Sequence, residues 1–169
     1  MNQGELRRAF GLFATGVTVV TGMNAQGQPV GVTANSMTSV SLDPPLLLWC
    51  LANKSGSLGA FALDSPFAVH VLSESQADVA LHFARSGSNK FAADVARDET
   101  KPPVIDAALA RITCRVVALH AAGDHTIILG QVDAVESRNT PPLLFHASRF
   151  GRFSPAQDEP WSLLVDMWS

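Results

Sequence analysis

The chain has 169 residues, of which 47% are hydrophobic and 16% are charged, and its net charge is −3 at pH 7. This length suits one domain with a sizeable core, and so apolar a composition favours a subunit interface as well. The acidic balance, without any basic run, argues against nucleic acid or an anionic membrane as a partner. No apolar run reaches the ~18 residues that a membrane-spanning helix needs.

The N-terminal residues carry charges where a secretory signal would need an apolar run, so we expect a cytoplasmic protein. Cys50 and Cys114 lie in apolar, strand-like runs. Buried free thiols are therefore predicted rather than a disulfide. The five histidines lack the spacing of metal ligands, and we predict no metal site.

The first half of the chain predicts one amphipathic helix and then short strands. Asn2 and Glu5 have the spacing of a capping box, which starts a helix over residues 4–14. Runs of β-branched and apolar residues predict the strands that follow. We expect strands at 17–21, 30–34 and 46–51, a turn at 24–29, and a short helix at 57–63.

The second half continues the same rhythm of short strands and few helices. We expect a strand at 67–72, a helix at 75–84 starting at Ser75, a loop at 85–103, long strands at 112–120 and 126–136, and a last strand or barrel rim at 143–150. The tail from 158 to 169 is apolar enough to pack against the domain or another subunit. Because no strand–helix–strand repeat occurs, the pattern favours a closed antiparallel barrel.

Two polar clusters flank the apolar run at 46–51. The first, residues 33–41, is rich in hydroxyl and amide side chains that could hydrogen-bond the edge of a flat heterocycle. The second, residues 53–57, offers backbone amides, hydroxyls and Lys54 to a phosphate, and a helix beginning near Ser57 would add its dipole. The same residue types also occur simply at strand ends and turns, with the lysine solvated.

The sequence GVTANSMTSVSLDPPL at residues 31–46 resembles the signature of the short-chain flavin reductases. These are the reductase components of two-component flavin-dependent monooxygenases, such as the styrene and 4-hydroxyphenylacetate monooxygenases. Further segments are similar to the family in the same order, so that the resemblance covers roughly residues 5–153. They are residues 10–22, Asn53-Lys54-Ser55 with Ser57, His82-Phe83-Ala84, Lys90-Phe91, Gly123 to Gly130, and Leu143 to Phe150.

The resemblance implies a mainly β fold, a split β-barrel of the Greek-key, FMN-binding type with a few peripheral helices. It implies one flavin-binding domain over residues 1–169 and a homodimer. The implied activity is hydride transfer from NADH, or alternatively NADPH, to FMN or FAD, with the reduced flavin supplied to a separate monooxygenase component. The cofactor would carry the redox chemistry, and the protein would position it.

The resemblance also implies roles for particular residues. The isoalloxazine and ribityl side would be lined by Thr33, Asn35 and Ser36, with Ser39, Val40 and Ser41 beside them. The ribityl-phosphate end would be held by Asn53, Lys54, Ser55 and Ser57, and Lys90 and Phe91 would close over the flavin. His125 would act near the nicotinamide or flavin ring, although a turn histidine without function is the alternative. The pyridine nucleotide or the partner's flavin would meet Phe145, His146 and Arg149.

One departure from the family concerns aromatic hydroxyls. Phe145 and Phe150 stand where many relatives have tyrosine, and the chain contains no tyrosine at all. Trp49 and Phe83 are expected in the core rather than at the flavin. Two other functions use similar barrels: a non-catalytic flavin- or haem-binding electron-transfer module, and an oxidase of the pyridoxamine-phosphate type. The sequence lacks the arginine-rich phosphate site expected for the latter.

Overall fold

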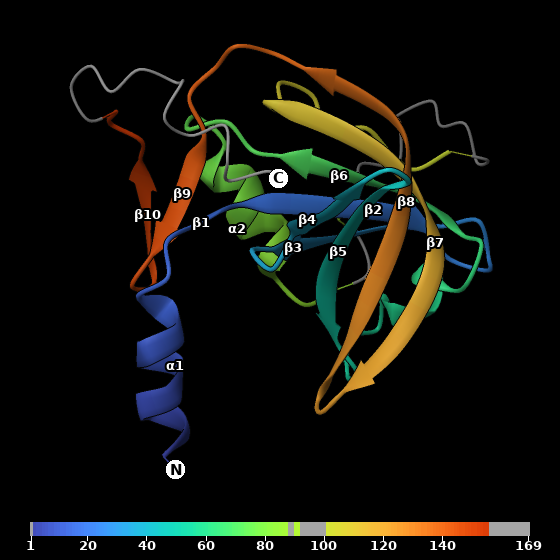
Figure 1. Ribbon diagram of the computed structural model, residues 1–169, viewed down its shortest axis with the longest axis horizontal. Helices are drawn as coiled ribbons and strands as arrows, with labels where there is room; N and C mark the ends of the chain where they lie inside the picture. The colour runs from blue at the N-terminus through green and yellow to red at the C-terminus, as the bar shows by residue number, and fades with distance from the viewer. Residues whose placement is uncertain (1, 88–89, 92–100, 156–169) are drawn as a thin grey trace.

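A computed structural model describes residues 2–87, 90–91 and 101–155. Across these residues the chain is mainly β, with two antiparallel sheets and few helices, as the sequence predicts (Figure 1). The expected packing of the tail at 158–169 lies outside the described residues.

The larger sheet has seven strands in the order β3-β2-β6-β7-β8-β5-β4. β5 to β8 form a Greek key, because β5 returns to pair with β8 while β6, β7 and β8 are consecutive neighbours. The strands are β2 (Thr18–Met23), β3 (Pro29–Ala34), β4 (Thr38–Leu42), β5 (Pro45–Ala52), β6 (Pro66–Val71), β7 (Ala110–Ala122) and β8 (His125–Ser137).

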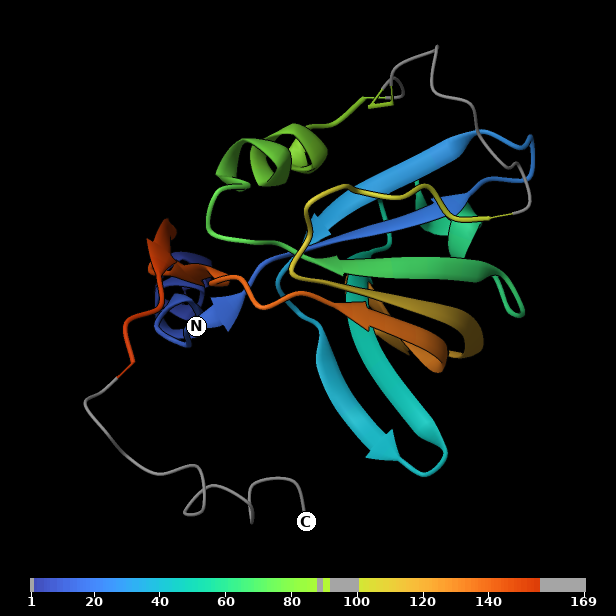
Figure 2. The same ribbon diagram turned by 90° about the horizontal axis from the view of Figure 1, so that it is seen from above.

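The sheet curls into a barrel around one apolar core. Val20 and Val32 from one end of the sheet share a buried cluster with Leu47 and Trp49 from the other end. Such contact is possible only if the two ends curve towards each other, as Figure 2 shows. Among the described residues β3 and β4 are the two edges of the sheet, which leaves the barrel split between them.

Aromatic rings fill the barrel. The rings of Trp49 and Phe61 meet edge to face at 4.9 Å, and Phe67 lies 6.3 Å from each of them. Gly130 on β8 makes room for this packing, because a Cβ there would lie 2.4 Å from the Phe67 ring. Trp49 is fully buried, as predicted. Burial also raises the pKa of the Cys114 thiol to about 12. Both cysteines are free, as expected, but only Cys114 is buried and Cys50 is half-buried.

The smaller sheet joins the two ends of the described chain in the order β1-β9-β10. It consists of β1 (Thr15–Gly16), β9 (Leu143–His146) and β10 (Arg149–Arg152). The prediction of one strand or barrel rim at 143–150 is therefore wrong, because this segment is a hairpin outside the barrel. Its Phe145 and Phe150 rings pack 5.7 Å apart. These are the two positions where the family resemblance would lead one to expect tyrosine.

The first helix, α1 (Gln3–Gly11), projects from the smaller sheet (Figure 1). Asn2 caps it by accepting a hydrogen bond from the backbone N–H of Gly4 at 2.9 Å, as the capping spacing predicts. The helix ends at Gly11 rather than at residue 14. None of its residues is buried within the chain.

Three other expectations need correction. β4 overlaps the first polar cluster, where no strand was expected; it is an edge strand with mostly exposed side chains, so its polar composition concealed it. The helix expected at 57–63 is only a 3-10 turn, η1 (Leu58–Phe61), which the extended backbone of Ala62 ends. α2 (Ala77–Ala84) begins after Gln76 rather than at Ser75.

Candidate functional site

A cavity of about 680 Å³ lies between β3, the loop after β5 and the end of α2. Its described lining contains three cationic side chains, Lys54, Arg85 and Lys90, and no carboxylate. Such an excess of positive charge suits an anionic ligand. Five predicted binding residues meet at this cavity: Thr33, Lys54, Ser55, Ser57 and Lys90. Its size also falls within the ~300–1,000 Å³ of small-molecule sites.

Lys90 ties the end of α2 to β3 at the cavity wall. Its Nζ donates to the carbonyl of Phe83 at 2.8 Å and to the carbonyl of Gly31 at 2.9 Å. Because an ammonium has three N–H groups, these two bonds within the described residues leave one for a ligand. Burial lowers the pKa of Lys90. Phe91 packs against Phe83 at 5.1 Å, within the apolar cluster under α2, and does not line the cavity.

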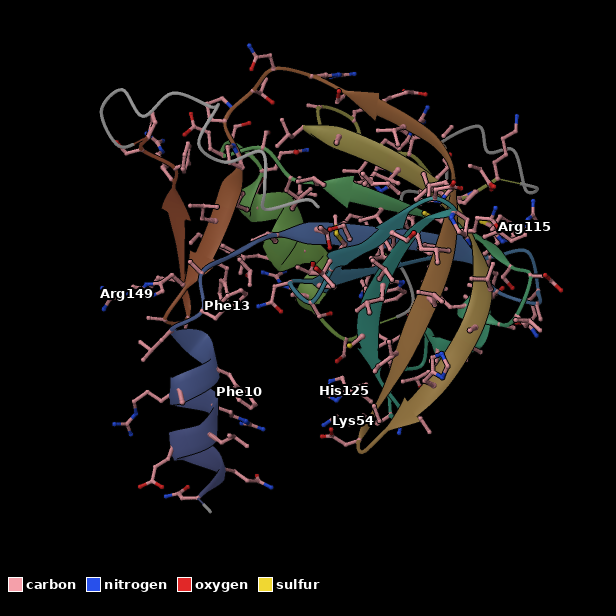
Figure 3. All side chains as sticks on the ribbon, in the orientation of Figure 1. Phe10, Phe13, Lys54, Arg115, His125 and Arg149 are labelled. Carbon is pink, nitrogen blue, oxygen red and sulfur yellow. The ribbon has the colours of Figure 1, made fainter. Side chains whose placement is uncertain are left out.

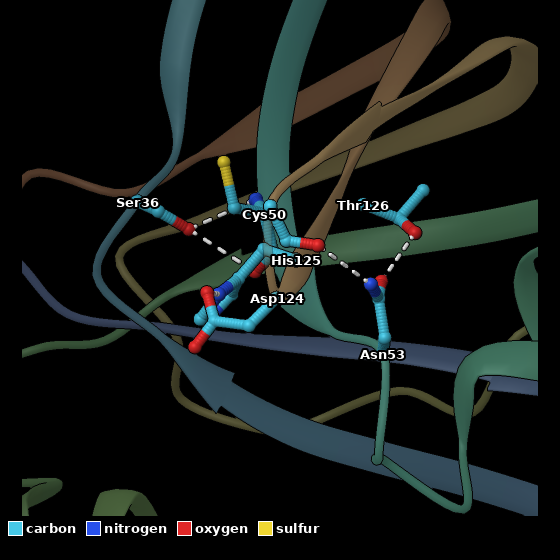
Figure 4. Close-up of polar contacts among 7 residues, drawn as sticks. Ser36, Cys50, Asn53, Asp124, His125 and Thr126 are labelled. Atoms are coloured by element: carbon cyan, nitrogen blue, oxygen red, sulfur yellow. Dashed lines mark hydrogen bonds and ion pairs between the residues drawn. The ribbon is translucent and has the colours of Figure 1, made fainter.

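The hydroxyl groups of the first polar cluster partly serve the fold. Thr33 donates to the carbonyl of Ala80 at 2.7 Å and so joins β3 to α2. Ser36 Oγ accepts from the backbone N–H of Cys50 at 2.9 Å and contacts its carbonyl at 3.3 Å (Figure 4). Asn35, Ser39 and Val40 are exposed near or on β4, and Ser41 is half-buried there. None of these four lines the cavity.

His125 is the first residue of β8, next to the two-residue turn Gly123–Asp124. Its Nδ1 lies 2.7 Å from the carboxylate of Asp124 (Figure 4). A carboxylate only accepts, so Nδ1 carries the proton, and Nε2 of a neutral ring is an acceptor. The hydrogen bond from His125 is the main cause that lowers the pKa of Asp124. The imidazole is 46% exposed, which leaves it open to a ligand.

Asn53 links the loop after β5 to the turn that precedes His125. Its side chain donates to the carbonyl of Gly123 at 3.1 Å and accepts from the Thr126 hydroxyl at 2.8 Å (Figure 4). Lys54 follows directly in the loop and lines the cavity, at the same end of the barrel as His125 (Figure 3). The polar loop after β5 and the histidine turn are therefore one structural unit.

No group of three or more His, Cys, Asp or Glu side chains in the described part of the chain could hold a metal ion. Within the same residues, neither helix is long and apolar enough to cross a bilayer.

The family model described as "Flavin reductase like domain" matches residues 10–154. The chain belongs to this family.

Named flavin reductases show the same likeness across almost the whole chain. An FMN reductase (NADH) of Agrobacterium fabrum is 46% identical over 90% of this chain and 87% of its own. The structure of an NADH:FAD oxidoreductase of Streptomyces globisporus, in complex with NAD and FAD fragments, has a TM-score of 0.83 at 41% identity, covering 93% of this chain and 96% of that one. The styrene monooxygenase flavin reductase of Pseudomonas putida S12 gives 0.77 at 30% identity, covering 89% and 97%.

Within this flavin reductase domain some of the predicted site residues lie apart from the cavity. Phe145, His146 and Arg149 lie in the smaller sheet, and Figure 3 places Arg149 far from Lys54 and His125. One chain therefore does not bring them to the cavity. Sequence reasoning missed Arg85 and the turn residues Asn24 and Gln28, which line the cavity. No local motif marks them, because only the fold brings the end of α2 and the β2–β3 turn to the same cavity.

Proposed function

We propose that this protein is an NADH-dependent flavin reductase that supplies reduced flavin to a separate monooxygenase component. The cationic cavity carries the proposal, since its three cations without a carboxylate fit the phosphate of FMN or FAD. The three relatives named above support the activity: two are named for NADH, and the third is a monooxygenase flavin reductase. We favour NADH over NADPH on the same basis.

In this proposal Lys54, Ser55, Ser57 and Lys90 hold the phosphate end of the flavin, and Thr33 lies on its ribityl side. The polar residues around β4 border the isoalloxazine ring: Asn35, Ser36, Ser39, Val40 and Ser41. When both nucleotides are bound, hydride passes from nicotinamide to flavin. The protein's contribution is to bind and orient them. η1 is too short to add a helix dipole, so the cations and backbone amides do this work.

Steady-state NADH consumption tests the function. Purified protein with free FMN or FAD in large excess is expected to oxidise many equivalents of NADH per protein, followed at 340 nm. Consumption that stopped after one equivalent would instead indicate an electron-transfer module with bound flavin. Hydrogen peroxide formed only with an amine substrate would indicate the pyridoxamine-phosphate oxidase type. Comparing KM for FMN and FAD identifies the flavin used.

We also propose that the protein is a homodimer in which α1 and the smaller sheet contact the second copy. Phe10 and Phe13 are 70% and 78% exposed, and Figure 3 shows them projecting from α1 and the segment after it. A nine-residue helix is marginal in water without packing, yet α1 buries no residue in its own chain. Docking of this arm would bring Phe145, His146 and Arg149 towards the partner's flavin.

Replacing Phe10 and Phe13 together with aspartate is expected to convert the dimer to a monomer, because it places two charges in an apolar interface. Sedimentation velocity measures the change. Leu63→Asp is the matched control, since Leu63 is 59% exposed but lies away from α1, and this variant should stay dimeric. A wild-type monomer, or a double variant that remained dimeric, would rule out this interface.

Two smaller assignments belong to the proposal. We place the protein in the cytoplasm, supported by its two free cysteines. We take residues 1–169 as one flavin reductase-like domain, supported by the family match over residues 10–154.

A further inference from the structure

Asn53 contacts three of the residues that surround His125. Its side-chain amide donates to the carbonyl of Gly123 at 3.1 Å, and its side-chain oxygen accepts from the Thr126 hydroxyl at 2.8 Å. Its backbone N–H also donates to the carbonyl of Asp124 at 2.9 Å. Residues 123, 124 and 126 are thereby bound by one residue of the loop after β5, and His125 lies between residues 124 and 126 in the chain (Figure 4).

These contacts lie at the tip of the β7–β8 hairpin. β7 and β8 each have 13 residues and meet in the tight turn Gly123–Asp124, whose residues are exposed. The regular pairing of β5 with β8 ends at Ala52 and His125. Asn53 extends this connection by one residue, around the turn. Without its side chain, the tip would be held to β5 only by backbone hydrogen bonds, and such exposed ends fray most readily.

The position of the imidazole depends on this turn. His125 Nδ1 is fixed by Asp124, whose carbonyl accepts from the backbone N–H of Asn53. The Asn53 side chain adds contacts to the residues that flank this pair, Gly123 and Thr126. The carboxamide of Asn53 is oriented from both its ends, towards Gly123 and Thr126, so that its contacts serve the turn. Asn53 is also absent from the described lining of the cavity, unlike the adjacent Lys54 and Ser55.

We propose that Asn53 is a positioning residue for His125 rather than a ligand of the flavin phosphate. The inference rests on the proposed function, in which His125 meets the nicotinamide. It replaces the role that the family resemblance suggests for Asn53, and it makes Asn53 and Thr126 part of the machinery for the hydride donor. Small displacements of a positioning group cost much activity, up to about 100-fold for roughly 1 Å.

A double-mutant cycle tests the proposal. Asn53→Ala is expected to lower kcat with NADH about tenfold, with the Kd for flavin unchanged. In a His125→Ala background the same substitution should have no further effect, because the two residues act as a unit. Thr126→Val should give a smaller loss of the same kind. Asn139→Ala, at an exposed loop position outside the cavity, is the matched control and should keep wild-type kinetics.

Two results would overturn the proposal. A tenfold rise in flavin Kd with unchanged kcat would make Asn53 a flavin ligand. Fully additive losses in the cycle would show that Asn53 does not act through His125. Urea unfolding of each variant separates a local effect from a global one. We expect kcat to fall while the unfolding midpoint stays within error of the wild type. A loss of activity that merely followed a loss of stability would count against the proposal.

A measurement without turnover keeps this inference separate from the proposed function. If wild-type protein did not oxidise NADH, the proposed function would fail, but the geometry could still be tested by carbon-13 NMR of the Asp124 carboxyl. In the wild type the hydrogen bond from His125 lowers the pKa of this carboxyl. Asn53→Ala should raise that pKa towards its ordinary value, and an unchanged titration would show that Asn53 does not hold the pair.

Discussion

His125→Ala is expected to lower kcat with NADH by about 100-fold and to leave the Kd for flavin unchanged. The magnitude follows from the usual loss on removing one oriented hydrogen-bonding group at a reacting centre, about 10²–10³ in rate. The flavin phosphate is expected at Lys54, Ser55 and Lys90, none of which the substitution touches. Stopped-flow reduction under saturating NADH separates the chemical step from binding.

The physical basis of this effect is the orientation of one imidazole nitrogen. Asp124 holds Nδ1, which restrains the ring and leaves Nε2 as the nitrogen that can meet a ligand. An ordered hydrogen-bonding group needs no rearrangement when the nucleotide binds, which is the main advantage of a preorganised site. Asp124→Asn should therefore lower kcat less than His125→Ala does. The amide oxygen of asparagine can still accept from Nδ1, but it holds the ring less strongly than a carboxylate does.

His120→Ala is the matched control for this experiment. His120 lies on β7 of the same hairpin, is exposed, and faces Ile127 in the ladder rather than the turn. It should keep wild-type turnover. Equal turnover of His125→Ala and the wild type would remove His125 from the mechanism and leave it as a turn residue, the alternative that the sequence also allowed.

Local sequence patterns predicted those parts of the fold that depend on local physics. Runs of β-branched and apolar residues marked β2 and β5 within one or two residues, and Asn2 marked the start of α1. β4 was missed because an edge strand with exposed polar side chains lacks the apolar alternation that reveals a buried strand. The β9–β10 hairpin was misread because its separation from the barrel depends on pairing with β1, more than 100 residues away.

The same division applies to the site. The loop from Lys54 to Ser57 could be predicted to line a polar, cationic site because its residue types carry that chemistry directly, and it does line the cavity. Arg85 could not be found, since its role depends on where α2 ends relative to β3. The roles of Asn53 and Ser36 also differ from the simplest expectation, because their partners lie 70 and 14 positions away in sequence. The residue types indicated that these side chains make polar contacts, but they did not identify the partners.

Stability should fall steeply as the pH drops below about 6.5, because of His70 on β6. This side chain is fully buried, and its Nδ1 lies 3.2 Å from the carbonyl of Val19. The carbonyl only accepts, so Nδ1 carries the single proton of a neutral ring. Nε2 is buried without a hydrogen-bond partner in the described structure, so a second proton there would be poorly solvated. Burial, and then the charge of Arg111, lower the pKa of His70 to about 4.

The sign follows from proton uptake by the two states. Below an unfolded pKa of about 6.5 the unfolded chain binds a proton at His70, whereas the folded chain does not do so until about pH 4. The stabilisation is therefore complete above about pH 6.5 and is lost as the pH falls towards 4. At ~1.4 kcal/mol per pKa unit, His70 alone should cost about 2 kcal/mol at pH 5 and about 3 kcal/mol at pH 4.

His70→Gln isolates this contribution, because glutamine retains an amide donor for Val19 but does not titrate. Urea unfolding at pH 7.5, 6 and 5 should show the wild type losing about 2 kcal/mol more than the variant over this range. The absolute stability of the variant at pH 7.5 does not affect the comparison, because only the change in unfolding free energy with pH is attributed to the imidazole. His120→Gln, at an exposed position of β7, should follow the wild-type curve. If the unfolding free energies of the wild type and His70→Gln changed with pH in parallel, the buried ring would be protonated as readily in the folded state as in the unfolded one. A hydrogen-bond acceptor for the protonated Nε2 would then be required in the folded protein.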